Sequence, residues 1–249
     1  MGRTALITGA SKRLGRAMAE HLAGLGWNII IHFNSSEEDA LELEDILRSG
    51  YPLQKFYHIQ ADLSVTDEVE KLIPKIASEF GKIDLLINNA SVFMPSLISE
   101  TSSKMLDKYF NIHLKTPFLL IRDFNNHFKN GTVVNIVDTR ITSNDSGYAA
   151  YSLSKQSLWN LTRMAAFEFS PGIRVNAIAP GLILPPEGKD SDYLEEMAQR
   201  IPMKKPGSIE TILKCLGFIL DNEYLTGQLI FADGGENLGY NKENGKDKS

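Results

Sequence analysis

A chain of 249 residues, 43% of them hydrophobic, is long enough to bury one substantial core, and we expect a single domain. The formal net charge of -5 gives no electrostatic reason to expect nucleic acid or an anionic membrane surface as a partner. A single cysteine, Cys215, cannot form an intramolecular disulfide, and no apolar run reaches the roughly 18 residues of a membrane helix, so we expect a cytoplasmic protein without a membrane partner.

Apolar, strand-like segments alternate along the chain with segments of helical periodicity. The expected strands cover residues 4–8, 28–33, 54–60, 85–88, 132–137, 174–179 and 228–232. The expected helices cover residues 15–25, 36–48, 66–80, 102–128, 151–169, 190–200 and 208–220. This alternation predicts an α/β fold in which helices cover both faces of a parallel sheet of about seven strands. Ligands then bind at the carboxyl ends of the strands.

Two segments in the last third of the chain do not fit the alternation. Residues 182–205 carry prolines and a glycine around a short expected helix, among them Pro185, Pro186 and Gly188, and we expect a mobile insertion over the ligand site. Residues 237–249 are polar and charged, so we expect a disordered tail after a folded domain of residues 1–236.

The stretch from Thr8 to Gly15 joins the first expected strand to the first expected helix. A strand, a glycine turn and a helix N-terminus can together hold a pyrophosphate, because the free N–H groups and the positive end of the helix dipole face the anion. Gly9 lets the chain turn tightly, and Gly15 lets helix and strand approach closely. By itself, the stretch also fits an ordinary strand-to-helix turn.

Tyr151 and Lys155 lie four residues apart at the start of another expected helix. They share one helix face, where the ammonium group favours the phenolate and lowers the phenol pKa from about 10. Such a pair can donate and accept protons in carbonyl or imine chemistry near neutral pH. Helices also carry this spacing as an ordinary surface and core pair.

Three further signals lie where expected strands end. Residues 88–91, Asn-Asn-Ala-Ser, follow the fourth strand at the edge that should face a cofactor. Asp62 and Leu63 follow the third strand, where the carboxylate can accept a hydrogen bond from an adenine amino group or, alternatively, cap a helix or turn. Pro180 and Gly181 close the sixth strand with a rigid turn.

In order and spacing, these motifs resemble those of the short-chain dehydrogenase/reductase family. The resemblance covers residues 3–235 and rests on Thr8-Gly9 with Gly15, Asn88-Asn89-Ala90, Tyr151 with Lys155, Arg174-Val175-Asn176, Pro180-Gly181 and Asp233-Gly234-Gly235. It implies a single Rossmann-type, doubly wound domain, a nicotinamide cofactor and a hydride transfer assisted by tyrosine and lysine. It also implies a homotetramer, because family members commonly assemble through the helices expected at 102–128 and 151–169.

Three residues depart from the usual family pattern. Arg13 stands where the family has a third glycine, Asp138 where it has serine, and His113 where it has asparagine. Together with Ser91 and Phe93, these departures resemble the pteridine reductases and bacterial dihydromonapterin reductases. This resemblance implies a pterin site formed by Arg13, Ser91, Phe93, Asp138 and Tyr151.

The chemistry of pterin reduction agrees with these replacements. Reducing a pterin C=N bond requires protons at ring nitrogen, which the carboxyl group of Asp138 can bind and relay, whereas a ketone reductase uses a serine hydroxyl. Arg13 can donate toward the pyrophosphate and the pterin carbonyl oxygen, and Phe93 offers a face for the ring. The family's asparagine helps to hold a water that links the lysine to solvent, and His113 can replace it as a proton shuttle. The alternatives are a turn cap for Asp138, core packing for Phe93 and a surface cation for Arg13.

Cofactor choice is expected to depend on the end of the second strand, where NAD-selective enzymes place an acid. This chain has the donors His32, Asn34 and Ser35 there, and Lys12 and Arg13 add positive charge, which favours the 2′-phosphate of NADPH. The expected cofactor-binding residues are Gly9, Ser11, Lys12, Arg13, Leu14, Gly15, His32, Asn34, Ser35, Asp62, Leu63, Asn89, Ala90, Tyr151, Lys155, Pro180 and Gly181. The other histidines do not cluster in the sequence, so we expect no metal.

These inferences predict NADPH-dependent reduction of a dihydropterin, such as dihydromonapterin, dihydrobiopterin or dihydrofolate, to the tetrahydro form. Tyr151 donates or relays a proton in this scheme, and Lys155 orients the ribose and lowers the tyrosine pKa. Asp138 contacts the pterin nitrogens and His113 sustains the relay. One alternative is reduction of a 3-oxoacyl carrier-protein or another small ketone. A second, from a different class, is a non-catalytic sensor that binds NADPH and regulates a partner.

Overall fold

The computed structural model describes residues 2–186 and 188–239, which contain a sheet of seven parallel strands in the order β3-β2-β1-β4-β5-β6-β7. The strands are β1 (Thr4–Ile7), β2 (Asn28–Phe33), β3 (Phe56–Gln60), β4 (Leu85–Asn88), β5 (Gly131–Ile136), β6 (Ile173–Pro180) and β7 (Leu229–Ala232). After β3 the chain crosses back to the other side of β1 and adds β4 there. The carboxyl ends of β1 and β4 therefore flank the place where the strand order reverses, which is where open α/β sheets bind ligands.

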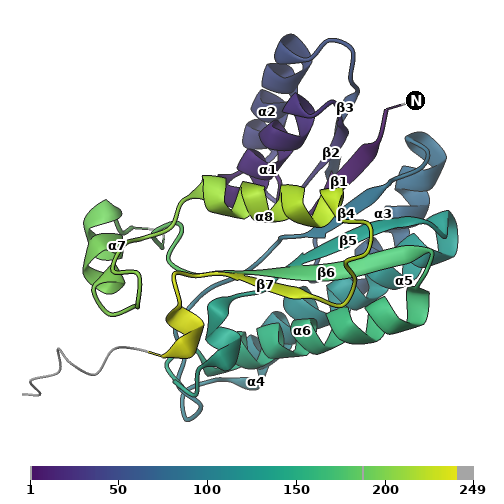
Figure 1. The fold of residues 1–249 in the computed structure, drawn as a ribbon. Coiled ribbons are helices and arrows are strands. Elements are labelled where there is room, and N and C mark those ends of the chain that lie inside the picture. Colours follow the sequence, from purple (N-terminus) through teal and green to yellow (C-terminus); the bar gives the residue numbers. More distant parts are fainter. Residues whose placement is uncertain (1, 187, 240–249) are drawn as a thin grey trace, which may run out of the picture.

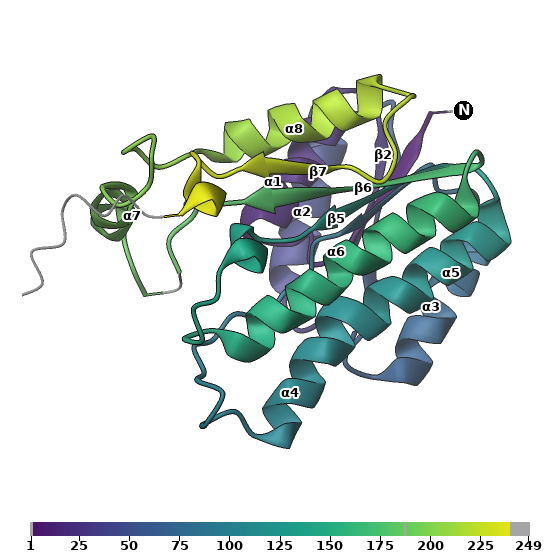
Figure 2. The same cartoon turned by 60° about the horizontal axis from the view of Figure 1, so that its bottom comes forward.

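Helices cover both faces of the sheet (Figure 1, Figure 2). α1, α2 and α8 pack on one face, and α3, α5 and α6 pack on the other. The α-helices are α1 (Arg13–Gly24), α2 (Glu37–Gly50), α3 (Thr66–Glu79), α4 (Ser103–Phe110), α5 (Thr116–Phe128), α6 (Ala149–Phe169), α7 (Ser191–Ala198) and α8 (Ile209–Asp221). Along β1, Ala5 and Ile7 join one core and Leu6 the other. Because both faces of the sheet are covered, its strands are apolar on both sides.

The long helix predicted over residues 102–128 is present, but its middle is not α-helical. It consists of α4, the π-helical turn η1 (Asn111–Lys115) and α5. A π-turn adds a residue to a helix and is frequent at functional sites. Here it carries His113, which is buried where η1 packs against α6. Hydrophobic periodicity cannot reveal such a turn, because apolar residues continue on both sides of it.

The end of the described chain differs from the prediction. Asn237 and Leu238 belong to the short 3-10 helix η3 (Glu236–Leu238), and the N–H of Asn237 donates to Asp233 Oδ2 at 2.8 Å. A disordered tail beginning at residue 237 is therefore wrong in its first residues, because a buried carboxylate holds them. Residues 240–249, the rest of the predicted tail, lie outside the described part of the chain.

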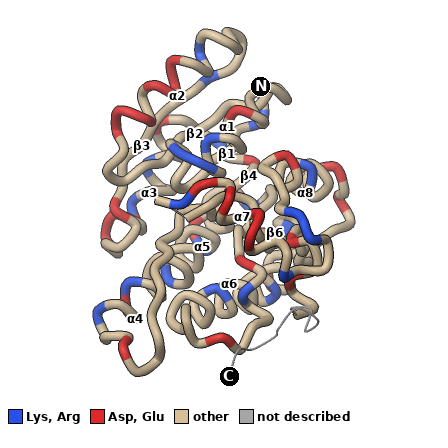
Figure 3. The backbone as a smooth tube through the Cα atoms, turned by 90° about the vertical axis from the view of Figure 1, so that its left-hand side faces the viewer, with Lys and Arg blue, Asp and Glu red and all other residues tan. Residues whose placement is uncertain are grey.

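The segment predicted as an insertion contains α7, which stands beyond the carboxyl ends of the strands (Figure 1, Figure 2). Leu194 and Ala198 of this helix are buried. Figure 3 views the molecule from this side and shows acidic and basic residues interspersed on the elements around the strand ends. Within residues 2–186 and 188–239, no helix is long and apolar enough to span a bilayer.

Candidate active site

A cavity of about 870 Å³ lies at the carboxyl ends of the strands. Loops that follow β1, β3, β4, β5 and β6 line it, as the topology predicts. Sixteen of the predicted site residues are in its wall: Gly9, Lys12, Arg13, Leu14, Gly15, His32, Asn34, Asp62, Leu63, Asn89, Ala90, Ser91, Phe93, Asp138, Tyr151 and Gly181. Ser11, Ser35, His113, Lys155 and Pro180 are not among its lining residues.

The glycine turn after β1 is held against β4 by a set of hydrogen bonds. The side-chain amide of Asn89 donates to the carbonyl oxygens of Thr8 and Gly9 at 2.9 and 3.1 Å. Thr8 Oγ1 accepts the N–H groups of Asn89 and Ala90 at 2.9 and 3.0 Å. A Cβ on Gly15 would lie 2.1 Å from the Gly9 oxygen, so no side chain fits there. The turn leaves open a cradle of the kind in which helix N–H groups hold a pyrophosphate.

Arg13 is the first residue of α1 and has a φ of 52°, in the left-handed region that favours glycine. Its guanidinium donates from Nη2 to the carbonyl oxygen of Pro185 at 2.5 Å. This contact joins the cofactor-side turn to the segment between β6 and α7. The sequence predicted that Arg13 donates to a pyrophosphate and to a pterin oxygen. In the structure it donates to a protein acceptor, the Pro185 oxygen.

His32 differs from its predicted role. Its Nδ1 accepts the N–H of Gly9 at 3.1 Å, so its Nε2 carries the proton and donates to the oxygen of Ala61, also at 3.1 Å. Burial lowers the His32 pKa to about 4. The prediction of His32 as a donor for a phosphate is wrong, because both ring nitrogens already bind the backbone and the ring is neutral.

The other cofactor-side residues also have protein partners. Lys12 forms an ion pair with Asp39 at 2.9 Å, between two partly exposed side chains. Asp62 accepts the N–H and the hydroxyl of Ser64 at 2.8 and 2.7 Å through one oxygen, which is the turn role given as its alternative. Asp62 nevertheless lines the cavity. A Cβ on Gly181 would lie 2.6 Å from the Cα of Asp233, which explains glycine at that turn.

Asp138 and Tyr151 form the polar centre of the cavity. The Tyr151 hydroxyl donates to Asp138 Oδ2 at 2.7 Å, and Asp138 Oδ1 accepts the N–H of Arg140 at 2.7 Å. Asp138 also caps the 3-10 helix η2 (Thr139–Thr142), which is the turn role given as its alternative. The one carboxylate therefore both caps this helix and binds Tyr151. Burial raises the pKa of the Asp138 carboxyl. Burial, and then the charge and hydrogen bond of Asp138, raise the pKa of the Tyr151 phenol well above 10.

Lys155 does not contact the Tyr151 hydroxyl in the way the helix spacing suggested. Its ammonium donates to the oxygen of Ile136 at 2.8 Å and lies 5.8 Å from the centroid of the Tyr151 ring. Burial lowers the Lys155 pKa to about 8. The prediction that Lys155 lowers the tyrosine pKa is therefore wrong for this arrangement: the phenol keeps its proton and gives the hydrogen bond to Asp138.

His113 is 1% exposed and braces the loop after β4 against α6. Its Nε2 accepts the N–H of Val92 at 3.2 Å and lies 3.0 Å from Ser91 Oγ. Its Nδ1 therefore carries the proton and donates to Ser154 Oγ at 2.8 Å. The Ser154 hydroxyl in turn donates to the backbone carbonyl oxygen of Tyr151 at 2.7 Å. Burial lowers the His113 pKa well below 6.5. The predicted shuttle role does not fit, because these bonds occupy both ring nitrogens of a neutral imidazole.

An aromatic wall that the sequence analysis only partly anticipated borders this centre. Phe93 stacks on Tyr148 with centroids 4.6 Å apart and meets the edge of Tyr151 at 4.8 Å. Phe93 remains 39% exposed, so core packing does not describe it. Tyr148 and Arg140 are wall residues that the sequence analysis missed. The signal for Tyr148 was its place three residues before Tyr151, one helical turn away.

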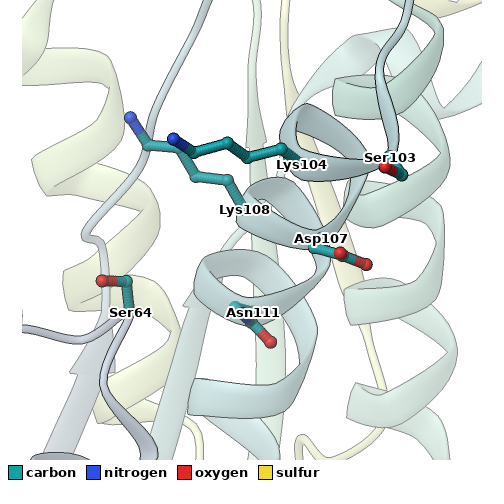
Figure 4. A pocket seen from close by; sticks show the side chains of 6 residues that line it. All are labelled: Ser64, Ser103, Lys104, Asp107, Lys108 and Asn111. Atoms are coloured by element: carbon teal, nitrogen blue, oxygen red, sulfur yellow. The ribbon is translucent and has the colours of Figure 1, made fainter.

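A smaller hollow of about 430 Å³ adjoins the cavity and is lined by Ser64, Ser103, Lys104, Asp107, Lys108 and Asn111. Figure 4 shows Lys104 and Lys108 extending from α4 on the side that faces Ser64. Ser64 and Lys108 line the main cavity as well. Over the described ranges, no group of three or more His, Cys, Asp or Glu side chains is placed to hold a metal ion.

Comparison with known proteins gives two kinds of relative. A family model described as enoyl-(acyl carrier protein) reductase matches residues 9–237. The 3-oxoacyl-[acyl-carrier-protein] reductase of Staphylococcus epidermidis is 31% identical over 244 residues, covering 94% of this chain and 99% of that protein.

Among solved structures, FolM alternative dihydrofolate reductase 1 from Brucella suis in complex with NADP is similar with a TM-score of 0.90 and 32% identity, covering 97% of each chain. A blue fluorescent protein from a metagenomic library in complex with NADPH is similar with a TM-score of 0.87 and 26% identity, covering 94% of this chain and 97% of that one.

Proposed function

This chain belongs to the short-chain dehydrogenase/reductase family of oxidoreductases, and we propose that it reduces a dihydropterin to its tetrahydro form with NADPH. The observation that carries the proposal is the hydrogen bond of 2.7 Å between Tyr151 and Asp138, a carboxylate at the position where the family usually has serine. The substrates we propose are dihydromonapterin, dihydrobiopterin or dihydrofolate.

The residues around the glycine turn fit a dinucleotide. Gly9 adopts the positive φ of the tight turn, and Gly15 lets α1 pack directly against that turn, since a side chain at Gly15 would clash with the Gly9 oxygen. Lys12, Asn34 and Ser35 would hold the 2′-phosphate, which has to compete with Asp39 for the Lys12 ammonium. The nicotinamide ring, when bound, supplies a hydride. Support for NADPH also comes from the Brucella suis relative, which was solved with NADP.

The protein's part in the chemistry is the delivery of a proton. Reduction of a C=N bond leaves negative charge at nitrogen, and Tyr151 would donate its hydroxyl proton there. Asp138 would bind the pterin nitrogens and exchange protons with Tyr151 across their hydrogen bond. The charge on Lys155, held by the Ile136 oxygen, stabilises the negative charge that remains on this pair.

The aromatic wall supports a flat, heteroaromatic substrate. Phe93 is backed by Tyr148 and fixed at its edge by Tyr151, so its exposed surface is held in place before a ring arrives. Rigid aromatic faces of this kind bind planar rings by stacking. The loop that carries Phe93 is fixed by His113, through the N–H of Val92, which makes His113 a positioning residue in this proposal.

A second candidate, reduction of a 3-oxoacyl carrier-protein or another small ketone, is favoured by the relationship to the Staphylococcus epidermidis enzyme. Asp138 argues against it, because an ionised carboxylate has no proton with which to polarise a ketone oxygen. A non-catalytic sensor would need only the cofactor side of the cavity, and Asp138 with Tyr151 would then have no task.

We also propose a homotetramer in the cytoplasm. Phe118 of α5 and Met164 and Phe167 of α6 are 52%, 69% and 92% exposed, on two helices that lie side by side (Figure 2). Large apolar side chains exposed on two neighbouring helices suit an interface with another copy of the chain. Light scattering after gel filtration measures the assembly, and Phe167→Glu should yield a smaller species. A wild-type monomer would contradict this assembly.

The test of the proposed activity is NADPH oxidation with four substrates: dihydromonapterin, dihydrobiopterin, dihydrofolate and an acetoacetyl thioester. We expect turnover of at least one dihydropterin and little of the thioester. Efficient reduction of the thioester with no reduction of any dihydropterin would replace the proposal with the ketone reductase. Binding of NADPH with turnover of none would favour the sensor.

A further inference from the structure

Arg140 occupies a distinctive place in the cavity wall. It follows Asp138 by two residues, and its backbone N–H holds that carboxylate at 2.7 Å. Its guanidinium carbon lies 4.4 Å from the centroid of the Tyr148 ring and 5.8 Å from that of Phe93. A cation placed over aromatic rings is attracted to their faces. The side chain is therefore held at the aromatic wall, where it borders the cavity.

The N–H groups of the Arg140 guanidinium lack hydrogen-bond acceptors of the kind that the other half-buried arginines have. Arg16, Arg122 and Arg174, the other half-buried arginines of the described chain, all donate side-chain hydrogen bonds to protein acceptors. The Arg140 side chain donates none to any residue in the described ranges. Among the described residues, its one ion-pair contact is with Asp145, at 3.9 Å, longer than a hydrogen bond. Since the Arg140 side chain is 24% exposed, its donors are neither deeply buried nor bound.

We propose that Arg140 binds a carboxylate on the side chain of the substrate and so favours negatively charged pterins over neutral ones. The proposal rests on the proposed function. A planar guanidinium offers paired donors that match the two oxygens of a carboxylate. The guanidinium carbon is 5.8 Å from the Phe93 centroid, which puts the cation within reach of a charged substituent on a pterin ring stacked there. Asp145, 60% exposed and weakly paired, is the protein carboxylate that the substrate displaces.

The test compares two substrates that share the pterin ring and differ in their side chains, of which only one is charged. Dihydrofolate carries carboxylates on its side chain and dihydrobiopterin carries none. The readout is the ratio of their kcat/KM values, which cancels effects common to both substrates. Arg140→Gln should lower the ratio of dihydrofolate to dihydrobiopterin by about tenfold or more, the effect of losing a hydrogen bond between charged groups. Arg140→Lys, which keeps the charge, should lower it less.

Asp145→Asn provides a second variant with the opposite expected sign. Asp145 Oδ1 accepts the N–H of Gly147 at 2.9 Å, and an asparagine keeps that acceptor. The variant removes only the charge that competes for Arg140, so the ratio should rise by roughly two- to threefold, in the range of a surface ion pair. Added salt should lower the wild-type ratio and leave that of Arg140→Gln nearly unchanged.

The outcomes separate this inference from the proposed function. An enzyme that reduces dihydropterins, with a ratio that Arg140→Gln leaves within twofold of wild type, overturns the role of Arg140 and leaves the proposed function standing. A fall in the ratio with Asp145→Asn also overturns the role. A wild-type protein that reduces no dihydropterin overturns both. If Arg140→Gln does not fold, the Asp145→Asn and salt measurements decide the matter without it.

Discussion

Asp138→Asn changes one oxygen of the central carboxylate to an amide nitrogen and keeps the other oxygen. Oδ1 can still accept the N–H of Arg140, as it does at 2.7 Å, so the loop keeps its anchor. The amide nitrogen cannot accept the Tyr151 hydroxyl, which donates to Oδ2 at 2.7 Å. The variant therefore removes one charge-assisted hydrogen bond and the proton acceptor while it preserves the shape of the site.

The size of the effect follows from these two losses. A hydrogen bond to a charged group contributes about 1.5–3 kcal/mol, roughly ten- to a hundredfold in rate if it acts in the transition state. Loss of a positioned acid or base costs roughly two to four orders of magnitude. We expect dihydrobiopterin turnover to fall by at least about a hundredfold, whereas the Kd for NADPH changes by less than about threefold.

Two measurements check this prediction: the steady-state rate of NADPH oxidation and a fluorescence titration of NADPH binding. Asp67→Asn makes the same chemical change at an exposed position of α3 and should behave as wild type. Asp138→Ser restores the family's usual residue and should lose dihydropterin turnover while it gains weak reduction of an acetoacetyl thioester. Asp138→Asn turnover above half of the wild-type value would refute the reasoning, since the carboxylate would then have no part in the chemistry.

Three further predictions concern the residues around this centre. Tyr151→Phe should lower turnover by roughly two to four orders of magnitude with NADPH affinity nearly unchanged, and a near-normal rate in steady-state assays would rule out its proton transfer. NADPH should bind at least about tenfold more tightly than NADH, a difference of about 1.4 kcal/mol, and Asp39→Asn should tighten NADPH binding alone, because it frees Lys12 from its ion pair. Equal dissociation constants for NADPH and NADH in fluorescence titrations would contradict this. The Lys155 ammonium, with a pKa of about 8, loses its charge as pH rises through that value, so kcat/KM should fall above about pH 8. A pH profile of kcat/KM that stays flat to high pH would exclude a role for this charge.

The fold could be predicted nearly whole because its signals are local and repeated. Each predicted strand is present within two residues of its expected ends, since a strand buried on both faces leaves a continuous apolar run. The π-turn around His113 and the 3-10 helix Glu236–Leu238 were not predictable in this way. Both depend on contacts between distant segments, such as the Asp233 carboxylate that holds the N–H of Asn237.

The site could be predicted as a set of residues but not as a set of bonds. Motif spacing brought Asp138, Tyr151 and Lys155 to one place, and the structure brings them together. Spacing does not say which acceptor each donor finds. The Lys155 ammonium donates to the backbone oxygen of Ile136. The two ring nitrogens of His32 bind the backbone N–H of Gly9 and the backbone oxygen of Ala61. Every residue type has the same backbone oxygen, so the sequence does not indicate which residue provides such a partner.

Arg13 has a consequence for anyone who wishes to redesign this protein. Its guanidinium fastens the Pro185 carbonyl, in the segment that leads to α7, to the turn that follows β1. A segment 182–205 taken from a relative with glycine at position 13 comes from a protein that lacks this contact. Arg13 and Pro185 are 172 residues apart in sequence and are better exchanged together. Chimaeras that receive residues 182–205 alone should discriminate less between substrates than chimaeras that also receive the relative's residue 13.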